Sequence, residues 1–169
     1  KVSKHFFIDG TFDTTPSGMA QLVVIMTNDV ITNFSKPVAY ILLSCKDIEC
    51  YTLAFQCFLS LLTNNDKEKI PLKAITVDFE DGLVTACKSV FKNCRLIGCL
   101  FHLKNALWRR ARSHKLGTKN VINDTKKIIE ILSALCWKPK QYKEVIQKLK
   151  REYKAKKDQL DFVKYFDKE

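Results

Sequence analysis

The stretch Phe6-Phe7-Ile8-Asp9-Gly10-Thr11-Phe12 decides the fold, because it places one acid inside an apolar run. A run of Phe and Ile predicts a buried strand, and a buried carboxylate is costly unless a cation or hydrogen-bond donors compensate it. The pattern returns at Ala74-Ile75-Thr76-Val77-Asp78-Phe79-Glu80. Two aspartates at the ends of core strands predict a shared cation.

The composition favours one substantial hydrophobic core, with room for a small appended module, since 46% of the 169 residues are hydrophobic. No apolar run reaches the roughly 18 residues that a membrane span needs, so we expect no membrane partner. The seven cysteines form no CxxC pair, and most fall on predicted helices or strands. We therefore expect reduced core cysteines of an intracellular protein rather than a disulfide framework.

Charge is distributed unevenly along the chain. Residues 1–90 have a net charge of −2 and residues 91–169 one of +13, which together give +11. A near-neutral half joined to a strongly basic half is typical of a metal site beside a surface that binds a polyanion. The alternative is a solvated helical region rich in lysine, and charge alone does not separate the two.

The first hundred residues show the periodicity of strands and helices in alternation. The predicted order is strand 4–12, strand 20–28, strand 37–44, helix 47–62, strand 73–79, helix 81–91 and strand 94–101. Three strands in succession favour an antiparallel meander, and strands separated by helices should join the sheet in parallel. We therefore predict an α/β fold with a mixed five-stranded sheet and flanking helices, an order that resembles a ribonuclease-H-like domain.

Beyond His102 the chain is entirely helical in pattern. Helices are predicted at 102–115, at 123–136, from Pro139 through Tyr153, and at 158–167. The sequence thus predicts two parts, with residues 1–103 as the first part of a catalytic core and residues 104–169 as a basic, all-helical segment.

Asp9 and Asp78 are the residues that we expect to carry the chemistry, because adjacent strands would bring both carboxylates within reach of one ion. Mg²⁺ or Mn²⁺ matches such hard oxygen ligands. In nucleases and transferases two such ions, about 3.5–4 Å apart, clamp the attacking and leaving oxygens of a phosphodiester. The alternative is that each carboxylate is satisfied by donors of the following turn, since Asp-Gly favours turns.

Three further acids lie near helix starts. Glu49 opens the first predicted helix and is a candidate third metal ligand, or else a surface acid that stabilises the helix dipole. Glu80 and Asp81 follow Asp78 and are expected to cap the next helix.

Cys99 and His102 stand three residues apart at a strand-to-helix junction. A zinc site would need two more ligands with compatible spacing. We therefore favour a local role for His102 near the end of the sheet, in contact with the backbone, the acids or a phosphate.

The helix predicted at 102–115 has a basic face with one aromatic residue. This face comprises Lys104, Trp108, Arg109, Arg112 and Lys115. Arginine beside an exposed aromatic ring can bind phosphates and stack on unpaired bases. The alternative is a solvated face whose Trp108 packs against a neighbouring helix.

Five blocks of sequence occur in a fixed order over residues 5–107. They are Ile8-Asp9-Gly10-Thr11-Phe12 with Pro16-x-Gly18 and Gln21-Leu22, Pro37-Val38-Ala39-Tyr40-x-Leu42-Leu43, Lys46-x-x-Glu49-x-Tyr51, Thr76-Val77-Asp78-Phe79-Glu80, and Cys99-Leu100-Phe101-His102-Leu103. Together they resemble the Mutator-like element (MULE) transposase domain.

The resemblance implies a DDE-type transposase core with a ribonuclease-H-like fold, which cleaves and joins DNA strands during transposition with two Mg²⁺ or Mn²⁺ ions. Asp9 and Asp78 match the first two metal-binding acids of the family, and Cys99 and His102 match its CxxH motif. DNA at the transposon ends and at the target would be the partner, the complete protein would be a homo-oligomer, and it would act in the nucleus.

The family's third acid is a glutamate that follows a helical insertion after the CxxH motif. Residues 104–169 would be the start of this insertion, and Phe162-Val163-Lys164-Tyr165-Phe166 resembles the segment before the helix with that glutamate. The chain would then hold two acids of three, with Glu169, Asp167 and Glu130 as candidate substitutes.

Two other functions stay open. One is a domesticated derivative that binds DNA or regulatory partners without cutting DNA. The other is a stand-alone nuclease of the same fold that uses Asp9, Glu49 and Asp78.

Overall fold

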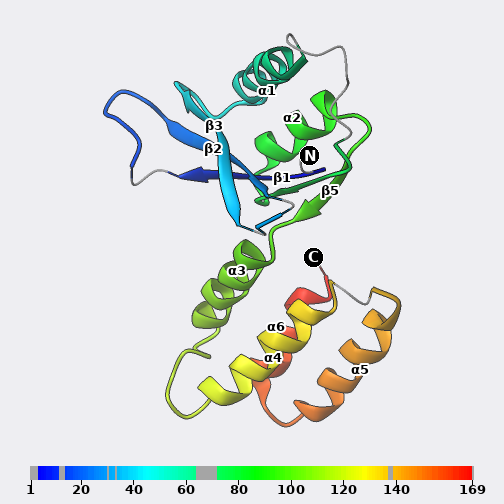
Figure 1. Cartoon of the computed structure of the whole chain (residues 1–169). Helices are drawn as coiled ribbons and strands as arrows, with labels where there is room; N and C mark the ends of the chain where they lie inside the picture. The colour runs from blue at the N-terminus through cyan, green and yellow to red at the C-terminus, as the bar shows by residue number, and fades with distance from the viewer. Residues whose placement is uncertain are drawn as a thin grey trace. The chain divides into compact units, whose positions relative to one another are not determined.

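The computed structural model describes residues 4–11, 14–29, 31–32, 34–63, 72–136 and 139–168. The chain divides into two compact units, which we call the α/β unit (residues 1–99) and the helical unit (residues 100–169). Figure 1 shows both units. The division follows Cys99, whereas the sequence predicts a boundary after Leu103.

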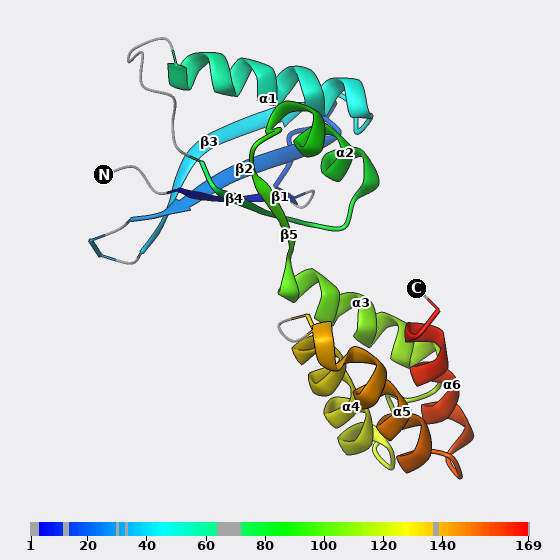
Figure 2. The same cartoon turned by 90° about the vertical axis from the view of Figure 1, so that its right-hand side faces the viewer.

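The α/β unit is built on a five-stranded mixed sheet (Figure 2). Hydrogen bonding between the strands gives the spatial order β3-β2-β1-β4-β5. The strands are β1 (His5–Thr11), β2 (Gln21–Asn28), β3 (Ser35–Leu43), β4 (Ala74–Val77) and β5 (Arg95–Gly98). The first three pair antiparallel, while β4 pairs parallel with β1 and with β5. The predicted mixed sheet, with a meander followed by parallel strands, is confirmed.

One face of this sheet is covered by helices α1 (Ile48–Thr63) and α2 (Asp81–Val90) (Figures 1 and 2). The core beneath them joins alternate strand residues to both helices; its members include Phe6, Ile8, Val23, Ile25, Leu43, Tyr51, Phe55, Phe58, Ile75, Val77, Leu83 and Phe91. Alternation of this kind is expected of strands with one covered face, because successive side chains point to opposite sides.

The opposite face of the sheet keeps large apolar side chains in contact with solvent. Tyr40 and Leu42 of β3 are exposed there, and they pair in register with Val24 and Leu22 of β2. Both described helices of the α/β unit lie on the other side. The sheet therefore has a covered face and an open face.

The helical unit contains every helix that the structure describes after β5. These are α3 (Leu100–Ser113), α4 (Ile122–Ala134), the short 3₁₀ helix η1 (Pro139–Gln141), α5 (Tyr142–Glu152) and α6 (Lys157–Phe166). They enclose a second core of buried residues that is separate from the core of the sheet; the members include Leu107, Ala111, Ile128, Ile129, Leu132, Ile146, Leu149, Tyr153, Phe162 and Val163.

Helix α3 ends two residues before the predicted limit. Lys115 adopts a left-handed φ of 60°, which is incompatible with continuation of a right-handed helix. The Arg110 guanidinium lies 3.9 Å from the centroid of the Tyr165 ring and so connects α3 to α6.

Within the described ranges, no helix combines the length and apolar character that crossing a bilayer requires.

The cysteines follow the predicted reduced, buried pattern only in part. Cys87 is buried, and burial raises the pKa of its thiol to about 12. Cys57 and Cys136 are exposed, while Cys45 and Cys50 form a disulfide. The turn from β3 into α1 brings the two Cα atoms to 6.3 Å, a separation that a disulfide can bridge. Spacing along the sequence does not reveal this proximity.

Candidate functional site

Asp9 and Asp78 lie at the same end of two adjacent parallel strands. In the register of β1 and β4, Ile8 is opposite Val77, and each aspartate follows this pair by one residue. Neighbouring strands are about 4.8 Å apart. Carboxylates at the same level of adjacent strands could both reach one cation.

Asp9 belongs to the open face of the sheet. Ile8 and Val77 are each 2% exposed beneath the helices, so the next side chain along β1 points to the opposite side. Accordingly Asp9 is exposed and Asp78 is half-buried. The expectation of a buried Asp9 is wrong, because the apolar run supplies one face of the strand and the acid lies on the other.

The turn after β4 orients the Asp78 carboxylate. Its Oδ1 accepts a hydrogen bond from the Phe79 N–H at 2.6 Å. A donor of the following turn thus satisfies this oxygen, as the alternative interpretation of the sequence predicts. The Phe79 ring packs over Gly98 at the end of β5, where a Cβ would lie 2.5 Å from the ring. Glycine at this position thus permits the ring to rest on the sheet next to the acid.

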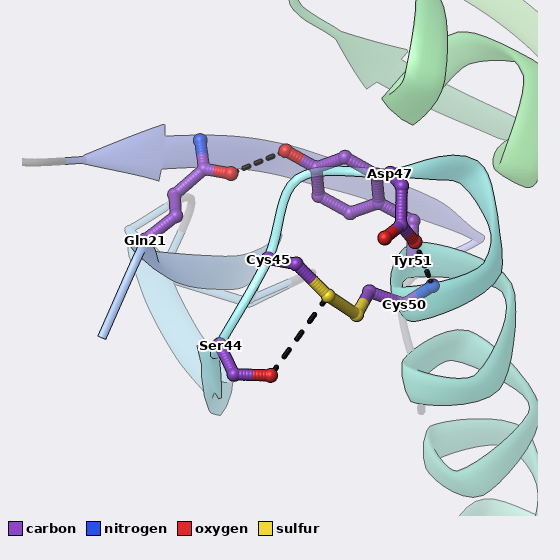
Figure 3. The surroundings of a disulfide bond; sticks show 6 residues. All are labelled: Gln21, Ser44, Cys45, Asp47, Cys50 and Tyr51. Atoms are coloured by element: carbon purple, nitrogen blue, oxygen red, sulfur yellow. Dashed lines mark hydrogen bonds between the residues drawn. A yellow bond between two sulfur atoms is a disulfide. The ribbon is translucent and has the colours of Figure 1, made fainter. Parts of the chain in front are cut away.

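A buried hydrogen-bond network connects the strand ends that carry the two acids. The Tyr51 hydroxyl of α1 donates toward Oε1 of Glu80 at 2.7 Å and contacts Oε1 of Gln21 in β2 (Figure 3 shows the contact with Gln21). Gln21 is 1% and Tyr51 0% exposed. The Gln21 amide lies against Gly10, where any Cβ would overlap it. Glycine directly after Asp9 is therefore a packing requirement.

The network changes the role that the sequence predicts for Glu80. Glu80 occupies the N-cap position of α2, but its side chain makes no capping hydrogen bond and instead accepts from Tyr51. Burial, together with the Glu80 carboxylate, raises the pKa of Tyr51, so the hydroxyl keeps its proton. The sequence patterns do not identify Gln21 as a structural support, although it stands as a polar residue at the start of an apolar strand and in the first of the five sequence blocks.

Glu49 is exposed in the first turn of α1. Among the described residues, one group of three His, Cys, Asp or Glu side chains has all its ligand atoms within 4.8 Å of one another, and it consists of Cys45, Asp47 and Cys50. In this conformation Glu49 therefore does not complete a three-acid group with Asp9 and Asp78. Its position fits the alternative of a dipole-stabilising surface acid.

The other candidate substitutes for a third acid gain no support. Asp167 accepts hydrogen bonds from Lys150 and Tyr142 within the helical unit, and Glu130 is exposed on α4. Glu169 lies outside the described residues.

The two residues of the CxxH motif lie on either side of the boundary between the units. The Cys99 N–H donates to the Val77 carbonyl at 2.8 Å, which continues the β4–β5 pairing and places Cys99 beside Asp78. His102 is half-buried in the first turn of α3, and its ring packs edge-on to Phe101. Neither residue belongs to a three-ligand group in the described part of the chain, so the zinc alternative gains no support.

The predicted basic face of α3 is largely accessible. Arg109, Arg112 and Lys115 are exposed and Lys104 is half-buried. Trp108 is partly buried against the helical core, as the packing alternative states. A role for its ring in stacking on bases stays a prediction.

The basic residues are concentrated in one unit. Residues 1–99 contain ten Lys and Arg and ten Asp and Glu, whereas residues 100–169 contain nineteen and eight. The whole formal net charge of +11 thus belongs to the helical unit. A positive field of this size attracts polyanions.

Comparison with known protein families assigns the α/β unit to the class of transposase domains. The MULE transposase domain matches residues 5–106, which is more than half of the chain and includes both aspartates. The chain belongs to the MULE transposase family, and the resemblance seen in the five sequence blocks is confirmed. A comparison with curated protein sequences gives no match.

Proposed function

We propose that the α/β unit is the first part of a DDE-type catalytic core with a ribonuclease-H-like fold, in a protein that cleaves and joins DNA strands during transposition. The observation that carries this proposal is the register of β1 and β4, which sets Asp9 and Asp78 next to each other after the pair Ile8 and Val77. The strand order β3-β2-β1-β4-β5 supports the fold.

The donor set fits a hard divalent cation. Two carboxylates that solvent can reach offer hard oxygen donors, which suit Mg²⁺ or Mn²⁺. Bound ions would supply activation of water or a 3′-hydroxyl and stabilisation of the leaving oxygen, and two are expected in the complete site. The role of Asp9 and Asp78 is to hold the metal, while the Gln21–Tyr51–Glu80 network keeps their strand ends in place.

The third acid in this proposal is the glutamate that the family resemblance predicts after a helical insertion. The helical unit would be the first part of that insertion. Its charge supports contact with the DNA phosphates of the transposon ends and the target, through Arg109, Arg112 and Lys115 together with Lys104 and Trp108. We further propose that the complete protein is a homo-oligomer and acts in the nucleus.

A second candidate function is DNA binding without cleavage, as in a domesticated derivative. The observation that favours it is the position of the net charge, which lies entirely in the unit without Asp9 and Asp78. DNA affinity could thus persist after loss of catalysis. A stand-alone nuclease that uses Glu49 is less well supported, because Glu49 does not group with the two aspartates.

Calorimetric titration with Mn²⁺ separates these functions. We expect the chain to bind Mn²⁺, Asp9→Asn and Asp78→Asn each to weaken binding at least about tenfold, and Glu49→Gln to bind as the parent chain does. Nicking of supercoiled plasmid by the same proteins provides a second readout. Absence of Mn²⁺ binding in the parent chain would favour the non-catalytic protein, and nicking that Glu49→Gln abolishes would favour the stand-alone nuclease.

A further inference from the structure

The turn between β3 and α1 gathers two cysteines and an aspartate in one cluster (Figure 3). Cys45 follows β3 by two residues, Asp47 directly precedes α1, and Cys50 is the third residue of that helix. Both sulfur atoms and a carboxylate oxygen lie within 4.8 Å of one another. The cluster is chemically unlike the site at Asp9 and Asp78, because two of its three donors are sulfur.

The disulfide between Cys45 and Cys50 is the oxidised form of this cluster. In tetrahedral coordination with Zn–S bonds of about 2.3 Å, two thiolate sulfurs are about 3.8 Å apart. Side chains that can bond to each other need only a small rotation to reach this separation. The backbone positions seen in the structure are therefore compatible with a metal between the two reduced cysteines.

The third donor is already oriented toward the cluster. Oδ1 of Asp47 accepts a hydrogen bond from the Cys50 N–H at 2.7 Å, which fixes the carboxylate at the start of α1 (Figure 3). Cys50 lies in the first helical turn, where the helix dipole favours a thiolate. Both cysteines are half-buried and Asp47 is exposed, so an ion can enter from solvent.

We propose that Cys45, Asp47 and Cys50, when the cysteines are reduced, form a three-ligand site for a thiophilic divalent ion, of which Zn²⁺ is the best match. Two thiolates with one carboxylate select zinc over magnesium and leave a fourth position for water. Metal binding displaces the thiol protons. It excludes the disulfide, and the disulfide excludes the metal.

The oxidised form is reached by exchange with a small disulfide such as glutathione disulfide. One cysteine thiolate attacks it and releases one glutathione thiol, and the second cysteine then attacks the mixed disulfide and releases the other. The protein dithiol loses two electrons and two protons, and the glutathione disulfide gains them. The turn therefore has two mutually exclusive states, one cross-linked by the disulfide and one by the metal, and both cross-links connect the end of β3 to α1.

Cobalt is the probe that tests this site, because Co²⁺ bound by thiolates in a tetrahedral site has intense visible and near-ultraviolet bands. The whole chain is reduced under anaerobic conditions and titrated with Co²⁺, and Zn²⁺ is then added as competitor. The variants are Cys50→Ser, Asp47→Asn, which keeps a good helix N-cap, and Cys57→Ser. The last is the matched control, since Cys57 is an exposed cysteine of the same helix outside the cluster.

We expect the thiolate bands to saturate at one Co²⁺ per chain and to be displaced by Zn²⁺. They should be absent from the glutathione-oxidised chain and from Cys50→Ser, present at about tenfold lower affinity in Asp47→Asn, and unchanged in Cys57→Ser. Bands that are absent from the reduced parent chain, or that persist in Cys50→Ser or in the oxidised chain, would overturn the proposal. Unchanged affinity in Asp47→Asn would remove Asp47 from the ligand set and refute the three-ligand site.

A measurement on the unsubstituted chain tests the site without depending on whether the variants fold. Zn²⁺ should protect Cys45 and Cys50, but not Cys57, from alkylation, as mapped by mass spectrometry. Equal alkylation of all three cysteines with and without Zn²⁺ would contradict the site. The outcome is independent of the proposed transposase function, because Mn²⁺ binding at Asp9 and Asp78 involves none of these residues.

Discussion

The two units of this chain differ in charge as sharply as they differ in fold. The α/β unit has as many acidic as basic residues and contains the paired aspartates, whereas the helical unit has all of the net charge of +11. Each has its own buried core. Under the proposed function, attraction of a polyanion and coordination of a metal would belong to separate units, so that each could be altered while the other persists.

The largest effects are expected when one core is damaged. Phe55 of α1 and Leu132 of α4 are each 0% exposed in different cores, so Phe55→Ala should cost about 3–5 kcal/mol and Leu132→Ala about 2–5 kcal/mol. Hydrogen exchange measured by mass spectrometry should show lost protection only in the unit that carries the substitution. Equal loss in both units from either variant would mean that the cores are not separate.

Two glycines of the α/β unit, Gly10 and Gly98, lie against a buried and an exposed side chain respectively, so substitution of each by alanine allows a comparison. Gly10→Ala collides with the buried Gln21 amide and should destabilise by about 1–3 kcal/mol, the usual cost of overpacking. Gly98→Ala meets the Phe79 ring, which is 55% exposed and can swing away, so less than about 1 kcal/mol is expected. Urea denaturation measures the free energy of unfolding of both variants. A larger loss for Gly98→Ala than for Gly10→Ala would contradict the role of Gln21 in holding the strand ends in place.

DNA affinity should depend on the helical unit. Replacement of Arg109 and Arg112 by alanine should weaken binding to duplex DNA and reduce the slope of log K against log salt by about 2, since each phosphate contact contributes about 0.9. The matched control replaces Lys73 and Lys88, two exposed lysines of the α/β unit. Fluorescence anisotropy at several salt concentrations distinguishes the pairs. If the control variant loses as much DNA affinity, the proposal that the helical unit provides the DNA contacts is wrong.

The smallest effect concerns an ion pair within the helical unit. The Lys150 ammonium, by hydrogen bonding, lowers the pKa of Asp167, and the Tyr142 hydroxyl also donates to it. A depressed carboxyl pKa stabilises the fold above the unfolded value of about 3.9, and this contribution is lost as pH falls through the folded pKa. Asp167→Asn should therefore cost a few tenths of a kcal/mol at pH 7.

The same substitution should cost less at pH 2 than at pH 7, because falling pH protonates the Asp167 carboxylate and removes the charge that Lys150 stabilises. Urea denaturation at the two pH values provides the test. A cost that is equal at both would show that Asp167 acts through packing rather than through its charge.

Much of the fold follows from local patterns in the sequence. The strands and the mixed pairing of the sheet were predictable because period-two alternation and connection length act over a few residues. The exposure of Asp9 was not, since an apolar run looks the same whether one or both faces of a strand are covered. The contact of Tyr51 with Gln21 and Glu80 joins residues about thirty positions apart, and no local pattern encodes it.

The sequence predicts the position of some candidate residues better than that of others. The proximity of Asp9 and Asp78 follows from strand order, which the sequence predicts. The packing of Trp108 against the helical core depends on how the helices associate, and a helical pattern that places a Trp among basic residues does not reveal it. The grouping of Cys45, Asp47 and Cys50 depends on one turn, whose path no spacing rule supplies.

The central claim is that Asp9 and Asp78 together hold a divalent metal, and paramagnetic broadening of the NMR spectrum by Mn²⁺ tests it most directly. At substoichiometric Mn²⁺, the amide resonances of Gly10 and Phe79 should broaden first, and Asp78→Asn should abolish this. Broadening that begins elsewhere, or that Asp78→Asn leaves unchanged, would contradict the account.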